Sequence, residues 1–162
     1  MSDLGAAAWP QADLDPLRRL KVIAAAVRAP MYAERHYDVP PERLWAVAAD
    51  LENELPHIIP ALKSFTLLGA EGERLTARAV GRLGLPEAFD VVLRPGWCLM
   101  QSRTLMGAMA AVPHDGGTTF AFASGLRRPG GALLKRLGLF GTEARGHALL
   151  DRLQERIDAR SH

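Results

Sequence analysis

Alternating apolar and polar residues predict a series of β-strands between residues 62 and 127. Short turn sequences separate neighbouring strands, among them Glu71-Gly72, Pro95-Gly96 and Asp115-Gly116. Together with an earlier strand at 32–39, the predicted strands cover residues 62–70, 74–83, 88–94, 97–103, 105–112 and 119–127. Because strands joined by tight turns pair antiparallel, we expect one antiparallel sheet of about seven strands.

The residues before the first strand have the pattern of an amphipathic helix. Asp15 is a suitable N-cap, Pro16 fits the first helical turn, and Pro30 marks the end. Apolar residues recur at helical spacing and form one stripe: Leu17, Leu20, Ile23, Ala24 and Val27. We expect this stripe to dock on the domain. The alternative is a basic amphipathic helix that contacts a membrane or gates a pocket.

Prolines divide the segment between the first two strands. Pro40-Pro41 ends the first strand and begins a helix over residues 42–51, and a proline-bounded helical turn follows at 55–60. Because proline lacks a backbone N–H, Pro56 is expected to prevent a continuous helix through that turn.

The C-terminal segment has two apolar stripes that are out of phase. On an ideal helix, one face would carry Leu133, Leu137, Phe140 and Ala144, and nearly the opposite face would carry Leu149, Leu150, Leu153 and Ile157. A break near residues 138–142 would reconcile the stripes, with Gly141 ending one helix and Thr142 capping the next. An unbroken helix would instead need the N-terminal helix to cover the second stripe.

Three stretches of the chain resemble the START-related, polyketide cyclase/dehydrase-like (SRPBCC) superfamily. Residues 37–47, with Asp50, Pro56 and Pro60 after them, are similar to its opening; residues 113–120 resemble its last hairpin and residues 149–154 its closing helix. The resemblance implies an α+β helix-grip fold, in which the predicted strands form a curved antiparallel sheet around a long C-terminal helix. We therefore expect an N-terminal tail and accessory helix at residues 1–30, and a START-like helix-grip domain at 31–162.

Composition narrows the class of protein only a little. With 162 residues, 48% hydrophobic and 23% charged, the chain is ordinary for one soluble domain, and a net charge of +2 does not argue for nucleic-acid binding. A single cysteine, Cys98, excludes an internal disulfide and favours the reducing cytoplasm. The apolar runs are too short for a membrane span, and residues 22–27 lack a signal-peptide cleavage site, so we expect neither stable membrane insertion nor secretion.

The resemblance implies a binding function. Members of the superfamily hold a hydrophobic small molecule between sheet and C-terminal helix, so we expect a lipid, polyketide, quinone or sterol-like ligand and a role as carrier or sensor. Small residues on the inner face of residues 74–83 agree with a cavity, although large side chains packed against the closing helix would explain them equally. The candidate lining residues are Ala77, Ala79, Phe89, Met100, Met106, Phe120, Phe122, Ser124, Leu133, Leu137 and Phe140.

Three polar residues are candidates for the interior of the cavity: Arg35, Tyr37 and Gln101. A buried arginine needs a partner, which would be a carboxylate or an acidic ligand; the alternative is an arginine at the rim that reaches water. An enzyme of the aromatase/cyclase or dehydratase type needs at least two ionisable groups that converge in the cavity, and no catalytic residue is assigned. A further alternative is a protein-interaction module with a filled core.

Metal and cofactor signals are weak. Asp50, Glu54 and His57 have spacings that would share a helix face, but Pro56 interrupts them and no second histidine lies at ligand spacing, so no metal is expected. Asp50 is expected to accept backbone hydrogen bonds at a helix end, and Cys98 to be a buried, inert thiol. No glycine-rich phosphate loop follows a strand, so no cofactor is expected either.

Overall fold

The computed structural model describes residues 14–27, 29, 31–127 and 143–161. The elements run in the order α1 (Pro16–Ala26), β1 (Met31–Tyr37), α2 (Pro41–Ala48), α3 (Leu51–Ile58), β2 (Leu62–Glu71), β3 (Arg74–Gly81), β4 (Pro86–Arg94), β5 (Trp97–Gln101), β6 (Leu105–His114), β7 (Gly117–Leu126) and α5 (Glu143–Ala159). Among these residues, no helix is long and apolar enough to cross a membrane.

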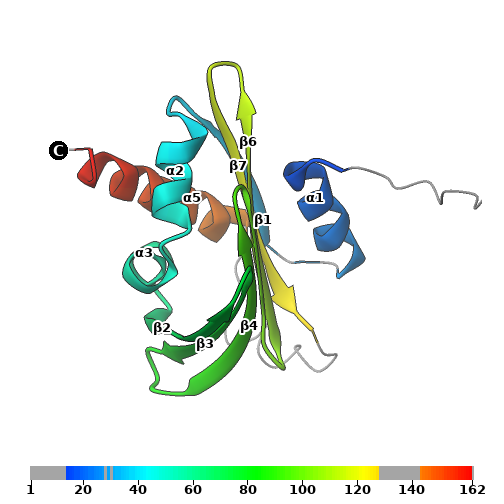
Figure 1. Ribbon diagram of the computed structural model, residues 1–162, viewed down its shortest axis with the longest axis vertical. Helices are drawn as coiled ribbons and strands as arrows, with labels where there is room; N and C mark the ends of the chain where they lie inside the picture. Colours follow the sequence, from blue (N-terminus) through cyan, green and yellow to red (C-terminus); the bar gives the residue numbers. More distant parts are fainter. Residues whose placement is uncertain (1–13, 28, 30, 128–142, 162) are drawn as a thin grey trace, which may run out of the picture.

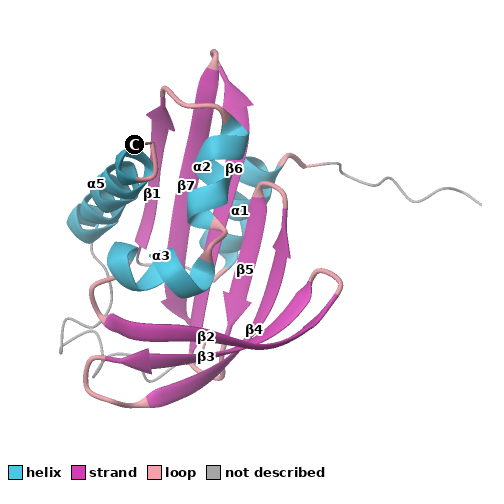
Figure 2. Cartoon of the chain, turned by 60° about the vertical axis from the view of Figure 1, so that its left-hand side comes forward, coloured by secondary structure: helices cyan, strands magenta, loops and turns pink. Residues whose placement is uncertain are grey.

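The seven strands form one sheet in the order β1-β7-β6-β5-β4-β3-β2, with every neighbouring pair antiparallel. Consecutive strands pair through hairpins from β2 to β7, and β1 then joins the sheet beside β7. The sheet is strongly curved, so that β2 and β3 run nearly across the direction of β1 and β7 (Figure 2). The predicted antiparallel sheet is therefore confirmed.

The helices lie on both sides of the sheet. α2, α3 and α5 lie against one side, which we call the concave face, and α1 lies against the other, the convex face (Figure 1). Side chains alternate between the two faces, and each face has its own apolar cluster. The concave cluster contains most of the large buried residues and is the main core of the domain.

The residues that predicted the start of α1 have the expected roles in the structure. The Asp15 carboxylate accepts a hydrogen bond from the Arg18 N–H at 3.0 Å, and Pro16 occupies the first turn. Leu20 and Ala24 are buried against the convex face of β6 and β7. The apolar stripe of α1 thus docks on the sheet.

The prediction that Pro56 prevents a continuous helix is wrong, because α3 runs through it. Asp50 caps this helix by accepting a hydrogen bond from the Asn53 N–H at 3.4 Å. Proline removes one backbone hydrogen bond, but the apolar side of α3 is buried through Leu51, Leu55 and Ile58. Burial of that face compensates for the lost bond in a helix of only two turns.

The closing helix α5 begins at Glu143, and its buried face carries the second apolar stripe of Leu149, Leu150, Leu153 and Ile157. It approaches β1 closely, because a Cβ on Gly146 would lie 2.8 Å from the Ala33 Cβ. The first stripe at 133–140 and the predicted break at 138–142 lie outside the described residues.

An ionic cluster joins α5 to α3. Glu54 is 1% exposed, and its carboxylate accepts hydrogen bonds from Arg156 at 2.6 and 3.3 Å and lies 2.7 Å from Arg160. Arg160 also bonds to Asp50 and to the Ala46 carbonyl at 3.2 Å. Arg156 in the last turn of α5 and Arg160 just after it therefore fasten this end of the helix to α2 and α3.

One edge of the sheet, β2, is partly occupied by the helix beside it. The Leu67 N–H donates a hydrogen bond to the Glu52 carboxylate of α3 at 2.6 Å. A register shift between Leu67 and Gly69 interrupts the pairing of β2 with β3, as in a β-bulge.

Candidate functional site

The candidate site is the concave face of β3 to β6, where small residues lie beside large apolar ones. Ala77 and Ala79 on β3 are buried on this face. Ala77 pairs with Phe89 on β4, and Met100 on β5 pairs with Gly107 on β6. Cross-strand partners share a face, so small and large apolar side chains lie side by side across these strands.

Gly107 shows how closely these side chains approach the sheet. A Cβ built on it would lie 3.3 Å from the Met100 Cε and 4.0 Å from the tip of the Phe122 ring. Met100 and Phe122 therefore lean over the backbone of β6. Farther along the concave face, the rings of Phe65 on β2 and Phe89 on β4 are 6.0 Å apart and tilted by 51°. The sheet thus presents aromatic rings and a flexible thioether around alanine and glycine.

Most of the predicted lining residues that the structure describes belong to this face: Ala77, Ala79, Phe89, Met100, Phe120, Phe122 and Ser124. Phe120 lies near the start of β7, where its ring packs edge-on against Tyr37, with the ring centroids 6.4 Å apart. Leu133, Leu137 and Phe140 lie outside the described residues.

Two predicted residues lie on the opposite face. Met106 packs in the convex cluster with Leu20 and Ala24 of α1. Gln101 pairs with Met106 and faces the same way. Successive strand residues point to opposite sides, so Gln101 cannot share a face with Met100. The prediction of Met106 and Gln101 as concave-face residues is therefore corrected.

Arg35 and Tyr37 reach α5 from the concave face of β1. Arg35 pairs with the Asp151 carboxylate at 2.7 Å and donates to the His147 carbonyl at 3.4 Å. The Tyr37 hydroxyl donates to the Leu150 carbonyl at 2.8 Å, and burial raises its pKa above the ordinary value. Arg35 thus has the carboxylate partner that one interpretation required. Both side chains fasten α5 to β1.

Glu87 is a polar residue of this face that the sequence interpretation missed. It pairs with Ala79, and its carboxylate accepts hydrogen bonds of 2.5 Å from the hydroxyls of Ser102 and Thr104. The sequence predicts that this strand begins at residue 88, because Pro86 has the pattern of a turn residue. β4 in fact begins at Pro86, and alternation from Phe89 would then have placed Glu87 inside. A half-buried carboxylate therefore lies at the end of the candidate site where β4 begins.

Asp50 and Glu54, whose spacing suggested metal ligands, bind arginines instead. Burial alone would raise the pKa of Glu54, but the hydrogen bond and charge of Arg156, with those of Arg160, outweigh it and lower the pKa. The pKa of Asp50 is likewise lowered, because hydrogen bonds from Arg160 and Asn53 outweigh its burial. In the described part of the chain, no group of three His, Cys, Asp or Glu side chains is arranged to hold a metal ion.

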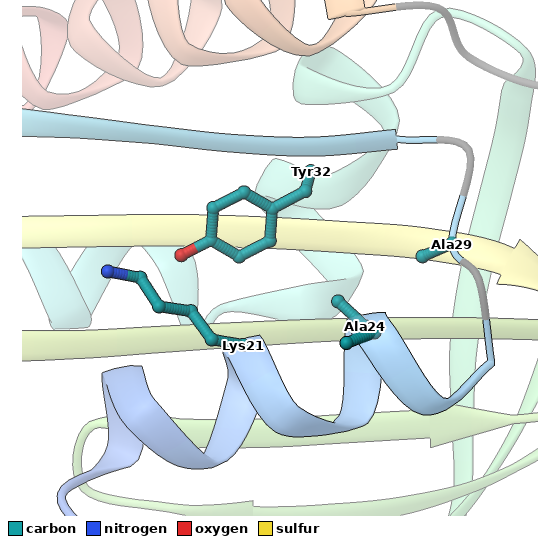
Figure 3. Close-up of a pocket in the computed structure, with 5 residues that line it drawn as sticks. Lys21, Ala24, Ala29 and Tyr32 are labelled. Carbon is teal, nitrogen blue, oxygen red and sulfur yellow. The ribbon is translucent and has the colours of Figure 1, made fainter.

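Two hollows in the described structure do not include Ala77, Ala79 or Gly107. A shallow one of about 350 Å³ lies between α1 and β1, lined by Lys21, Ala24, Ala25, Ala29 and Tyr32 (Figure 3). Glu34 binds both polar groups there, since it accepts a hydrogen bond from the Tyr32 hydroxyl at 2.8 Å and lies 3.4 Å from Lys21. The other, of about 730 Å³, borders the β2–β3 turn; its lining includes Asp90 and Gln101 of the convex face and Leu75 and Val91 of the concave face.

The architecture is similar to that of several solved structures. The protein TTHA0849 from Thermus thermophilus has a TM-score of 0.61 at 24% identity, with 82% of this chain and 99% of that chain covered. A norcoclaurine synthase point mutant from Thalictrum flavum, in complex with a transition-state analogue, has a TM-score of 0.57 at 14% identity, with 82% and 95% covered. The protein NE0264 from Nitrosomonas europaea has a TM-score of 0.58 at 13% identity, with 81% and 95% covered.

No family model matches the sequence, and no curated protein matches it either. At the identities of the solved structures, the similarity concerns the fold alone. It confirms the helix-grip fold that the resemblance to the SRPBCC superfamily implied.

Proposed function

We propose that this protein binds a hydrophobic small molecule on the concave face of its sheet, as a carrier or sensor. The observation that carries the proposal is the set of small residues Ala77, Ala79 and Gly107 bordered by Met100 and Phe122. Ligand sites are concave and mostly apolar, with a few polar groups that orient the ligand. A lipid, polyketide, quinone or sterol-like molecule has the matching chemistry.

The position of α5 supports this proposal. In the described residues, α5 makes its main sheet contact with β1 at one edge, where Gly146, Tyr37 and Arg35 fix it. In the described residues, α5 thus packs mainly on β1 and not on the concave faces of β3 and β4. Glu87 and Ser124 supply polar groups near one end of this face, where the polar part of an amphipathic ligand would lie.

The enzyme alternative receives less support. A cyclase or dehydratase of the kind considered needs two ionisable groups converging on the substrate. Glu87 is one such group, whereas Arg35 and Tyr37 are engaged by Asp151 and Leu150. We therefore favour binding without catalysis. We also propose the cytoplasm as the compartment, and residues 1–30 as an accessory segment of the 31–162 domain.

Native mass spectrometry of the purified protein, followed by solvent extraction, tests the proposal. A bound apolar molecule, or uptake of one from a mixed lipid and polyketide extract, is expected. A ligand-free mass without uptake contradicts the proposal and favours a protein-interaction module with a filled core.

A matched pair of variants assigns the binding face. Ala79→Leu adds bulk on the concave face, whereas Ala88→Leu adds the same bulk on the neighbouring strand, at an exposed position on the convex face. The extracted molecule, or the apolar fluorophore anilinonaphthalene sulfonate, should bind at least about tenfold more weakly to the Ala79 variant and normally to the Ala88 variant. Equal binding by both variants would place the ligand elsewhere.

A further inference from the structure

The two most exposed large apolar side chains of the described chain lie on one hairpin turn. Leu83 is 82% exposed and Leu85 is 71% exposed, both between β3 and β4. This turn lies at the end of the sheet where β1 begins and β7 ends. Single exposed leucines are ordinary on a protein surface. Two on one protruding turn form a small exposed apolar patch, which is the kind of surface that contacts a partner or a membrane.

The turn is held in place, so its leucines are presented by a fixed backbone. The Gly84 N–H donates to the Gly81 carbonyl at 2.9 Å, and the Gly81 N–H donates to the Leu85 carbonyl at 3.2 Å. Gly84 has a φ of +80°, which suits glycine in a tight turn. Arg82 anchors the turn to the segment after α3 through its N–H, which donates to the Ala61 carbonyl at 3.0 Å. Folding thus leaves Leu83 and Leu85 outside even though their backbone is ordered.

Arginines lie near the apolar patch of Leu83 and Leu85. Arg82 is in the turn itself, where its guanidinium Nε donates to the Pro60 carbonyl, and Arg103 and Arg127 are exposed on the adjoining loops. The Arg127 guanidinium donates to the Ser102 carbonyl at 2.6 Å, while the Ser102 hydroxyl bonds to Glu87 near the start of β4. Among the described residues near this turn, Glu87 is acidic; its carboxylate is half-buried and already accepts two hydrogen bonds.

We propose that this corner of the domain, formed by the β3–β4 turn and the loops that carry Arg103 and Arg127, docks reversibly on the surface of an anionic lipid bilayer. Leu83 and Leu85 enter the interfacial region, and Arg82, Arg103 and Arg127 lie at the level of the lipid phosphates. Apolar insertion and attraction of basic residues to anionic lipids are the two contributions that bind peripheral proteins to membranes. The inference does not depend on the concave face holding a ligand.

The size of the corner favours a bilayer over a folded protein partner. A stable protein interface buries about 800 Å² on each side, which two leucines and three arginines on loops do not supply. A bilayer accepts a small apolar insertion without a matched surface, and its anionic headgroups complement the arginines.

Co-sedimentation with extruded vesicles tests the proposal on the full chain. The protein is expected to pellet with vesicles of phosphatidylcholine and phosphatidylglycerol, and weakly with phosphatidylcholine alone. The double variant Leu83→Ser/Leu85→Ser should bind at least about tenfold more weakly. Arg103→Gln should reduce binding by about fivefold, and high salt should reduce wild-type binding because it screens the charges.

Leu68→Ser is the matched control, because Leu68 is 65% exposed but lies on β2, well away from the β3–β4 turn. It should bind vesicles as the wild type does, and circular dichroism should show that all variants fold. The proposal is overturned if anionic vesicles do not bind the protein, if the double variant binds normally, or if neutral vesicles bind equally well. Self-association without lipid that the double variant abolishes would instead make the corner a contact between copies.

Discussion

The Glu54 carboxylate lies in the interior with its Oε2 only 2.6 Å from the Arg156 Nε, although 102 residues separate the two in the sequence. Arg160, just after the end of α5, approaches the other oxygen at 2.7 Å, so one buried carboxylate binds two arginines at this end of the helix. Leaving a buried charge without its partner is costly, because desolvation is then uncompensated.

Arg156→Met should therefore destabilise the fold. We expect the free energy of unfolding to fall by about 1–3 kcal/mol, below the full cost of a broken buried pair because Arg160 still binds Glu54. Urea unfolding followed by circular dichroism measures the change. Arg152→Met, one turn earlier on the same helix, should change stability by less than about 0.5 kcal/mol. Equal effects of the two variants would show that the pair contributes nothing specific.

Acid should weaken the same cluster. The pKa values of Asp50 and Glu54 lie below their ordinary values of 3.8 and 4.5 in the folded state. Groups with a lowered folded pKa stabilise the protein fully above the ordinary pKa, and this contribution is lost as pH falls through the folded pKa. Unfolding free energy should thus decline from about pH 5 downward. Glu54→Gln should make that decline shallower, and an unchanged pH profile would contradict the assignment.

Gly146→Ala should destabilise the protein although alanine favours helices. Its Cβ would lie 2.8 Å from the Ala33 Cβ, so α5 must move away from β1. Overpacking of this kind costs about 1–3 kcal/mol, which exceeds the gain in helix propensity of about 1 kcal/mol. The double variant Ala33→Gly/Gly146→Ala should recover part of the loss. Chemical denaturation of the two variants tests this, and a more stable single variant would refute the close approach.

Tyr37→Phe should lower stability while leaving ligand binding intact. The Tyr37 hydroxyl donates to the Leu150 carbonyl, so its loss removes a buried hydrogen bond and should cost about 1–2 kcal/mol. Thermal unfolding and binding of anilinonaphthalene sulfonate are the two measurements. Weakened probe binding at unchanged stability would restore Tyr37 as a polar group of the binding site.

Cys98 should be inert in the folded protein. It is 0% exposed, and burial raises the pKa of its thiol to about 12. Because the thiolate is the reactive form, Ellman's reagent should react with Cys98 only after denaturation. The reaction in urea serves as the control, and rapid reaction of the native protein would show that the core of β5 is open.

Much of the fold could be predicted from the sequence, because strand alternation and turn residues act locally. The Asp15 cap and the glycine turns are examples. The helix through Pro56 could not be predicted from local rules, since burial of Leu51, Leu55 and Ile58 outweighs the loss of one hydrogen bond.

The candidate site was less predictable, because each face assignment depends on where a strand begins. A strand predicted from residue 88 does not include Glu87, because β4 begins at Pro86. Met100 and Gln101 follow each other in β5, so their side chains lie on opposite faces of the sheet. The partners of Arg35 and Glu54 lie more than 100 residues away, and no pattern within a strand or helix identifies them.

The Glu52 carboxylate that binds the Leu67 N–H also affects how copies of this chain meet. An exposed edge strand is a template on which another chain can add a strand, and the pairing can then propagate into aggregates. Here a helix side chain already occupies one edge amide, and the bulge after Leu67 breaks the regular row of the others. Although Leu67 and Leu68 are exposed, a strand from another copy could not form a regular hydrogen-bonded ladder along this part of β2. The contact of α3 with β2 therefore opposes aggregation through this edge.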